Sequence, residues 1–286
     1  MAAQTWLITG SSRGFGRALA TAALEAGDNV VATARKPSDL SELVELYPER
    51  SVAVELDVVE ELAAEDAVAA AVDRFGRLDV VVNNAGYANV APIEFADDFH
   101  NQFDTNFWGV YNVTVAAVPV MKAQGGGTIV QFSSVGGRVG GTPGLGSYQA
   151  AKFAVDGFTR VLAAEVRPFR IRTLVVEPSG FATDWAGSSM GVDEIPPEYE
   201  ETVGAFGRFR EAAALTAGDP VRAAEILVRV VKRRHLPSHL LLGAGAVDRA
   251  QDYSRSQLDQ AAEWAAVSRS ADFAEDYPVD LPKDPA

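Results

Sequence analysis

Short runs of apolar, often β-branched residues recur along the chain, and they alternate with segments in which apolar residues repeat at helical spacing. This alternation is typical of a parallel sheet that is covered by helices on both faces. The pattern therefore predicts one α/β domain with a doubly wound parallel sheet of about seven strands. The predicted strands are Trp6–Thr9, Asn29–Ala34, Val52–Asp57, Val80–Asn83, Thr128–Ser133, Ile171–Glu177 and His239–Leu242.

The segments between the predicted strands carry helix signals. Gly27 stands where a left-handed residue would end the first helix, and Ser38 is placed to cap the next one. The range 97–124 predicts one long helix, in which Gly109 and Pro119 are expected to cause irregularities. The first helix is indicated by the spacing of Phe15, Leu19, Ala23 and Ala26.

The pattern changes in the last third of the chain. Residues 1–245 contain all the predicted strands and form the predicted main domain. Between about 183 and 219 the sequence loosens into glycine, proline, aromatic and arginine residues, which predicts a mobile lid. Residues 246–286 are expected to form a C-terminal extension, with a helix around Leu258–Val267 and then an acidic tail.

Composition indicates a soluble globular protein, with 48% hydrophobic and 22% charged residues. A net charge of −14 makes binding to nucleic acid or to an anionic membrane surface unfavourable. The chain has no cysteine, and its 3 histidines lack metal-ligand spacing, so we expect no metal site. The start of the chain does not resemble a signal peptide, and no apolar run approaches membrane-spanning length, so we expect a cytoplasmic protein.

Three glycines follow the first predicted strand, at Gly10, Gly14 and Gly16. A strand that turns sharply into a helix here would bring backbone amides and the positive end of the helix dipole close to a pyrophosphate. The spacing is GxxxGxG, which differs from the GxGxxG of two-domain dehydrogenases. The motif predicts a dinucleotide site.

The end of the second predicted strand bears on the choice of dinucleotide. An acidic residue there typically binds the adenosine ribose hydroxyls of NAD, but this chain has Ala34 followed by Arg35. A guanidinium can bind a 2′-phosphate through two charge-assisted hydrogen bonds. Arg13 and Arg35 therefore favour NADP(H).

Tyr148 and Lys152 are four residues apart in a predicted helix, so their side chains lie on one face. A free tyrosine has a pKa near 10. We expect the Lys152 ammonium to lower the pKa of the phenol, which would make Tyr148 an acid that works near neutral pH.

Together with Ser133-Ser134-Val135-Gly136-Gly137, these motifs resemble the short-chain dehydrogenase/reductase family over about residues 5–245. The resemblance implies a single Rossmann-type domain and an NADP(H)-dependent enzyme. It further implies that Tyr148 donates a proton to a substrate carbonyl and that Lys152 also binds the nicotinamide ribose. The glycine spacing argues against a rival family of extended enzymes that epimerise or dehydrate nucleotide sugars.

The resemblance also assigns roles to further residues near the reacting atoms. Ser134 is expected to hold the carbonyl oxygen, with Ser133 as the competitor, although Ser134 stands one residue further from the tyrosine than the family commonly places it. Asn106 resembles an asparagine that anchors a proton-relay water. In the segment Glu177–Thr183, Thr183 is expected to contact the nicotinamide amide, and Ser179 replaces a usual glycine.

The remaining cofactor contacts follow from the same resemblance. Asp57 and Val58 are expected at the adenine ring, and the segment Asn84-Ala85-Gly86 beside the ribose. The expected cofactor residues are Gly10, Ser12, Arg13, Gly14, Phe15, Gly16, Arg35, Asp57, Val58, Asn84, Ala85, Gly86, Tyr148, Lys152, Pro178 and Thr183.

The predicted reaction interconverts a ketone or aldehyde and an alcohol. Trp185, Met190, Phe206 and Phe209 suggest a hydrophobic substrate, with Trp185 as a substrate contact beside Ser134 and Tyr148, but the same residues would also suit the core of a lid. A catalytically silent NADP(H)-binding sensor or scaffold is the alternative from another class. Relatives are commonly dimers or tetramers, so a homodimer or homotetramer is compatible with the resemblance.

Overall fold

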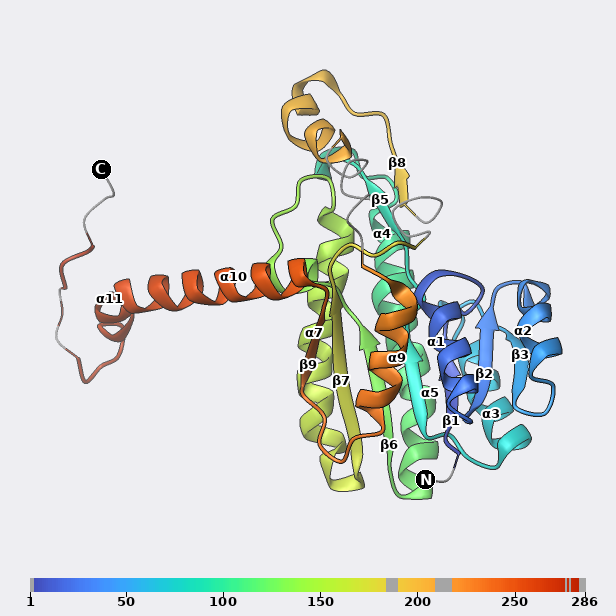
Figure 1. Cartoon of the computed structure of the whole chain (residues 1–286). Coiled ribbons are helices and arrows are strands. Elements are labelled where there is room, and N and C mark those ends of the chain that lie inside the picture. The colour runs from blue at the N-terminus through green and yellow to red at the C-terminus, as the bar shows by residue number, and fades with distance from the viewer. Residues whose placement is uncertain (1–2, 184–189, 209–217, 276, 278, 283–286) are drawn as a thin grey trace.

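The computed structural model describes residues 3–183, 190–208, 218–275, 277 and 279–282. A sheet of 7 strands runs through the molecule in the order β3-β2-β1-β4-β6-β7-β9, and every pairing is parallel (Figure 1). The predicted α/β doubly wound fold is therefore confirmed. The strands are β1 Thr5–Ile8, β2 Asn29–Ala34, β3 Ser51–Glu55, β4 Val80–Asn83, β6 Gly127–Phe132, β7 Ile171–Pro178 and β9 His239–Leu242.

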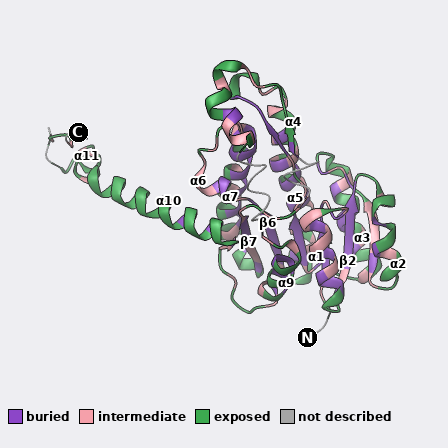
Figure 2. Cartoon of the chain, turned by 45° about the horizontal axis from the view of Figure 1, so that its top comes forward, coloured by how far each residue is buried: buried purple, intermediate pink, exposed green. Residues whose placement is uncertain are grey.

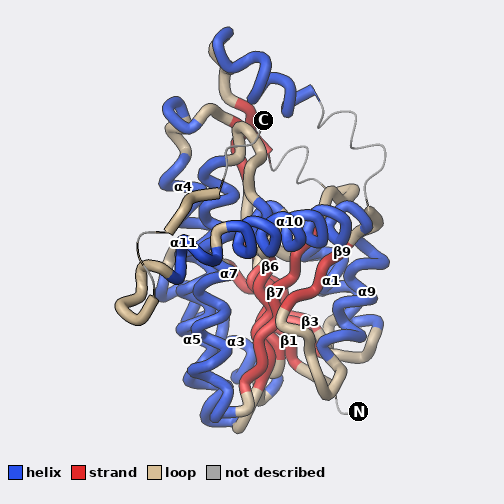
Figure 3. The backbone as a smooth tube through the Cα atoms, turned by 90° about the vertical axis from the view of Figure 1, so that its left-hand side faces the viewer, coloured by secondary structure: helices blue, strands red, loops and turns tan. Residues whose placement is uncertain are grey.

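Helices pack on both faces of this sheet, which is why the central strands are apolar on both sides (Figure 3). One face is covered by α1 (Gly14–Glu25) and α9 (Pro220–Val231), with Leu19 and Leu227 in the core. The other face is covered by α3 Glu61–Phe75, α5 Gly109–Gln124 and α7 Gly146–Val166. Shorter elements are the 3-10 turns η1 Pro37–Leu40, η2 Ile93–Phe95, η4 Arg167–Phe169 and η6 Pro197–Tyr199, and the helices α2 Ser41–Leu46, α4 Phe99–Phe103 and α6 Gly136–Val139.

The first helix ends as predicted, because Gly27 is left-handed with a φ of 86°. The predicted cap at Ser38 is wrong. Pro37 begins the turn η1 after Lys36, and Ser38 lies inside it, where its carbonyl accepts a hydrogen bond from the Ser41 hydroxyl at 2.9 Å. A proline fits the first position of a helical turn because its φ is already fixed there.

The predicted helix over 97–124 is present as three consecutive pieces. The helix α4 passes into the π-helical turn η3 (Asp104–Trp108), and α5 continues from Gly109. The main irregularity is therefore the π turn, which adds a residue to one turn of the helix. Pro119 lies within α5 and does not end it.

A second, smaller sheet stands beyond the carboxyl ends of the main strands. It pairs β5 (Ala88–Val90) with β8 (Met190–Val192) in parallel, and the pattern of the sequence did not predict it. A third apolar core joins it to η7 (Glu200–Gly204) and to the start of α7, through Val90, Met190, Val203 and Tyr148. The described part of the predicted lid thus packs directly beside the tyrosine.

The C-terminal extension is a helical arm, which begins earlier than predicted. The helix α10 covers Ala244–Glu263 and α11 covers Ala265–Arg269. Only Ala246 and Ala250 of α10 are buried, and the rest of the arm projects away from the sheet with mostly exposed side chains (Figures 1 and 2). Within the described residues, no helix combines the length and apolar character needed to cross a membrane.

Candidate active site

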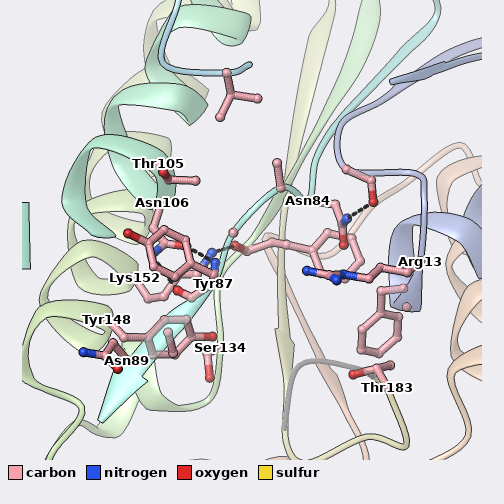
Figure 4. Close-up of a pocket in the computed structure, with 18 of the residues that line it drawn as sticks. Arg13, Asn84, Tyr87, Asn89, Thr105, Asn106, Ser134, Tyr148, Lys152 and Thr183 are labelled. Atoms are coloured by element: carbon pink, nitrogen blue, oxygen red, sulfur yellow. Dashed lines mark hydrogen bonds between the residues drawn. The ribbon is translucent and has the colours of Figure 1, made fainter. Parts of the chain in front are cut away.

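A cavity of about 1000 Å³ opens at the carboxyl ends of the central strands (Figure 4). Open α/β sheets bind their ligands at this edge. Gly16 packs against Gly10 and does not line the cavity. Trp185, the predicted substrate contact, lies outside the described residues, as does Phe209. The cavity is lined by the other predicted site residues: Gly10, Ser12, Arg13, Gly14, Phe15, Arg35, Asp57, Val58, Asn84, Ala85, Gly86, Asn106, Ser134, Tyr148, Lys152, Pro178 and Thr183.

The glycine loop has the geometry that the motif requires. Gly10 has a φ of 66°, which side chains rarely allow. At Gly16 a Cβ atom would lie 2.1 Å from the Gly10 carbonyl oxygen, so the helix could not approach the loop with any larger residue. The loop is therefore a close-packed cradle at the start of α1, which fits a dinucleotide pyrophosphate.

Asn84 braces this loop from the next strand. Its side-chain amide donates to the carbonyl oxygens of Thr9 at 2.9 Å and Gly10 at 3.3 Å. In return, the Thr9 hydroxyl accepts from the backbone amides of Asn84 and Ala85 at 2.9 Å each. The side chain of Asn84 thus fixes the glycine loop.

The two predicted phosphate-binding arginines lie in the same half of the cavity. Arg13 precedes α1, and Arg35 follows Ala34 at the end of β2; both are exposed. Ala34 is buried and supplies no carboxylate. This half of the cavity therefore has the charge that suits an anionic ligand group.

Tyr148 and Lys152 lie on the first turns of α7 and are 6% and 4% exposed. The Lys152 Nζ atom donates to the Phe132 carbonyl oxygen at 2.7 Å and lies 5.7 Å from the centre of the Tyr148 ring. Burial lowers the pKa of Lys152 to about 8.

The expected lowering of the Tyr148 pKa is wrong for the chain by itself. Burial raises the pKa of Tyr148 to about 12, and a hydrogen bond with Ser134 acts in the opposite direction. Desolvation of the buried ring disfavours the phenolate, and this effect outweighs the hydrogen bond. The phenol is therefore held protonated, as an acid in carbonyl reduction must be.

The contacts of Ser133 and Ser134 show that the two neighbouring serines have different roles. The Ser133 hydroxyl is buried and donates to the Lys152 carbonyl oxygen at 3.1 Å, so it ties β6 to α7. The Ser134 hydroxyl accepts from the Gly136 amide at 3.0 Å and forms a hydrogen bond with Tyr148. Figure 4 shows the two side chains next to each other. The structure brings Ser134, and not Ser133, beside the phenol.

Asn106 lies in the π turn and is fully buried. Its side chain exchanges two hydrogen bonds with the backbone of Tyr87, at 2.9 and 3.1 Å. A Cβ atom at Gly86 would lie 2.4 Å from the Asn106 Oδ1 atom and 3.6 Å from the Lys152 Nζ atom. The absence of a side chain at Gly86 thus lets the asparagine and the lysine come close together.

Ser179 does not disturb the loop that follows β7. Arg170 is the one non-glycine residue of the described chain with a positive φ, so Ser179 has an ordinary backbone conformation. Its amide donates to the Leu242 carbonyl oxygen at 3.0 Å, which holds the loop against β9. Pro178 and Thr183 still line the cavity, with Thr183 near Gly14.

Sequence reasoning missed two polar pairs, of which Asn89 and Asp193 line the cavity. Arg138 forms a bidentate ion pair with Glu177, with a closest contact of 2.8 Å, and this pair links α6 to β7. Asn89 donates to Asp193 at 2.7 Å beside the tyrosine. The long separation of each pair in the chain left no local signal, although Asn89 interrupts an apolar run.

Comparisons with known proteins agree with this geometry. The sequence model described as short chain dehydrogenase matches residues 4–191. An oxidoreductase of Botryotinia fuckeliana is 47% identical over 249 residues, which cover 86% of this chain and 90% of the relative.

Two solved structures extend the similarity to the fold. A short-chain dehydrogenase from Streptomyces avermitilis superposes with a TM-score of 0.88 at 36% identity, over 95% of this chain and 99% of that one. A short chain dehydrogenase from Burkholderia cenocepacia, solved in complex with NADP, has a TM-score of 0.72 at 25% identity, over 91% of this chain and 96% of that one.

Proposed function

Since this chain belongs to the short-chain dehydrogenase family and is an oxidoreductase, we propose that it interconverts a carbonyl group and an alcohol with NADP(H). One observation carries the proposal: the buried Tyr148 and Lys152 and the partly buried Ser134 share a cavity with the close-packed glycine loop. When bound, the nicotinamide supplies the hydride in reduction or accepts it in oxidation.

The residues of the chain supply the proton and stabilise the charges that develop. Tyr148 donates its phenolic proton to the carbonyl oxygen, and the Ser134 hydroxyl donates a hydrogen bond to the same oxygen as negative charge develops there. With a pKa of about 8, Lys152 is mainly charged at pH 7 and stabilises the phenolate that remains. Asn106 lies near Lys152, and it anchors a water through which Tyr148 regains the proton that it has donated.

The proposed reaction is tested by monitoring NADPH oxidation with a panel of aldehydes, ketones and quinones. Tyr148→Phe should lose about 10²–10⁴-fold in rate, because general acids typically contribute that much. Its affinity for NADPH should stay close to wild type, since the ring is retained. Tyr111→Phe, on the exposed side of α5, is the matched control and should keep full activity.

Two outcomes would count against the proposal. A Tyr148→Phe variant that keeps more than about a tenth of the wild-type rate would mean that another group donates the proton. Tight binding of NADPH without turnover of any carbonyl compound would favour a sensor or scaffold instead.

We also propose a preference for NADP(H) over NAD(H), which Arg13 and Arg35 support. NADPH should bind at least about tenfold more tightly than NADH, a difference of about 1.4 kcal/mol. Arg35→Ala should weaken the binding of NADPH and leave that of NADH unchanged, because NADH lacks the 2′-phosphate. Fluorescence titration with both cofactors measures this, and equal affinities in the wild type would contradict it.

The predicted hydrophobic substrate is supported only in part by the cavity wall. Met190 is buried and Phe206 is partly buried in the small core beside Tyr148, so both serve as packing residues. Apolar surface does reach the cavity from Ala88 and Phe181, but Asn89 and Asp193 interrupt it. We therefore propose a mainly hydrophobic carbonyl compound that also carries a polar group.

A further inference from the structure

Asn89 and Asp193 form a polar pair at the end of the cavity where Tyr148 lies. Asn89 is 9% exposed, and its Nδ2 atom donates to the Asp193 Oδ2 atom at 2.7 Å. Both residues line the same cavity as Tyr148. Figure 4 shows Asn89 beside Tyr148, on the opposite side of the view from Arg13.

The small sheet holds this pair in a fixed place. Asn89 is aligned with Gly191 in the pairing of β5 and β8, and a Cβ atom at Gly191 would lie 2.5 Å from the Asn89 Oδ1 atom. The Asn89 amide donates to the buried Gln102 side chain at 3.1 Å, and the Asp193 amide donates to Val90 at 3.0 Å. Both backbones are therefore anchored, and the asparagine side chain needs the glycine opposite.

The pair offers hydrogen-bond acceptors and a negative charge. A carboxylate has about four acceptor positions, of which the Asn89 amide uses one. Among the lining residues that the structure describes, the cations are Arg13 and Arg35 in the other half of the cavity and Lys152, whose Nζ atom donates to Phe132. The net charge of −14 adds a field that attracts cations and repels anions.

We propose that Asn89 and Asp193 bind a protonated amine of the substrate. The inference rests on the proposed carbonyl reduction and names the substrate class as amino ketones and the corresponding amino alcohols. An ammonium group has three donors and no acceptor, so it matches the carboxylate of Asp193 and the Asn89 Oδ1 atom together. A carboxylate or phosphate on the substrate would meet repulsion at the same place.

The test compares alkyl ketones of equal length that end in an ammonium, a methyl or a carboxylate group, with spacers of increasing length. For wild type we expect the largest kcat/KM with an ammonium ketone, at least about tenfold above its methyl counterpart, and the smallest with the carboxylate. An equal or greater kcat/KM for the methyl ketones would overturn the inference while leaving the proposed reaction intact. No reduction of any ketone would instead reject the proposed function.

Substitution assigns the preference to the pair. Asp193→Asn keeps an acceptor for the Asn89 amide but removes the charge, so the ratio of kcat/KM for ammonium and methyl ketones should fall at least about tenfold. Glu194→Gln, which changes a neighbouring exposed carboxylate that does not line the cavity, is the matched control and should keep the wild-type ratio. An unchanged ratio in Asp193→Asn would contradict the inference.

If that variant did not fold, the salt dependence of wild type provides the test. Increasing salt should reduce the preference of wild type for ammonium ketones, and a salt-independent preference would contradict the inference.

Discussion

Burial of the Lys152 ammonium is unfavourable for folding, although the proposed chemistry needs this charged group in the cavity. Desolvation lowers the pKa of Lys152 from 10.5 to about 8, so the unfolded chain binds this proton more tightly than the folded chain does. Between these two pH values the unfolded state holds more protons. The free energy of unfolding therefore rises with pH over this interval. A variant without the lysine should lack this part of the pH dependence.

Lys152→Met tests this at the level of one residue. As the pH rises from 8 towards 10, the stability of wild type should increase relative to the variant, with a slope of up to about 1.4 kcal/mol per pH unit. The range stops at 10 because the tyrosines of the unfolded chain, with a pKa near 10, ionise around that pH, whereas burial raises the pKa of Tyr148 to about 12. Urea unfolding of both proteins at several pH values gives the slope, and parallel pH profiles would refute the expectation.

The ion pair between Arg138 and Glu177 holds α6, the short helix that follows Ser134, against β7. Glu177 is fully buried, so Glu177→Gln leaves the Arg138 guanidinium without its charged partner. This substitution should lower the free energy of unfolding by about 2 kcal/mol or more. Glu42→Gln removes an equally short ion pair to Arg17 in which the carboxylate is 89% exposed, and should change stability by less than about 1 kcal/mol. Urea unfolding compares the two, and similar losses would show that burial does not decide the effect.

At the scale of the elements, the sequence predicted what local patterns determine. The seven main strands lie within two residues of their predicted bounds, because burial on both faces makes each one an apolar run. The β5–β8 sheet was not predictable in this way, since each strand has 3 residues and the partner lies far along the chain. Predicted site residues line one cavity because strand ends meet at one edge, whereas the Asn89–Asp193 contact depends on that small sheet.

Pro119 in α5 supplies a prediction about an element. Pro119 lies on the exposed side of the helix, where it supplies no amide donor and its ring crowds the preceding turn. Pro119→Ala should therefore raise the stability of the folded chain by about 1–3 kcal/mol, and thermal unfolding measures the shift. Val115→Ala, one turn earlier on the exposed surface, should change stability by less than about 1 kcal/mol. A destabilised Pro119→Ala protein would mean that the proline shapes α5 to fit the sheet.

At the scale of the whole molecule, the C-terminal arm contributes little to the core. Ala246 and Ala250 are the buried residues of α10, so a chain that ends at residue 252 keeps these contacts. We expect this truncated chain to unfold at nearly the same temperature as the full chain and to bind NADPH equally well. A large loss of thermal stability would show that the distal arm packs on the domain or on another copy in solution.

The arm also affects how the size of the protein should be measured. A helix of 20 residues is about 30 Å long, which is comparable with the diameter of a small domain. A monomer with such a projection diffuses more slowly than a sphere of the same mass and leaves a gel-filtration column early. Its elution volume alone would therefore suggest a dimer, and light scattering, which reports mass independently of shape, is the measurement that distinguishes an elongated monomer from an assembly.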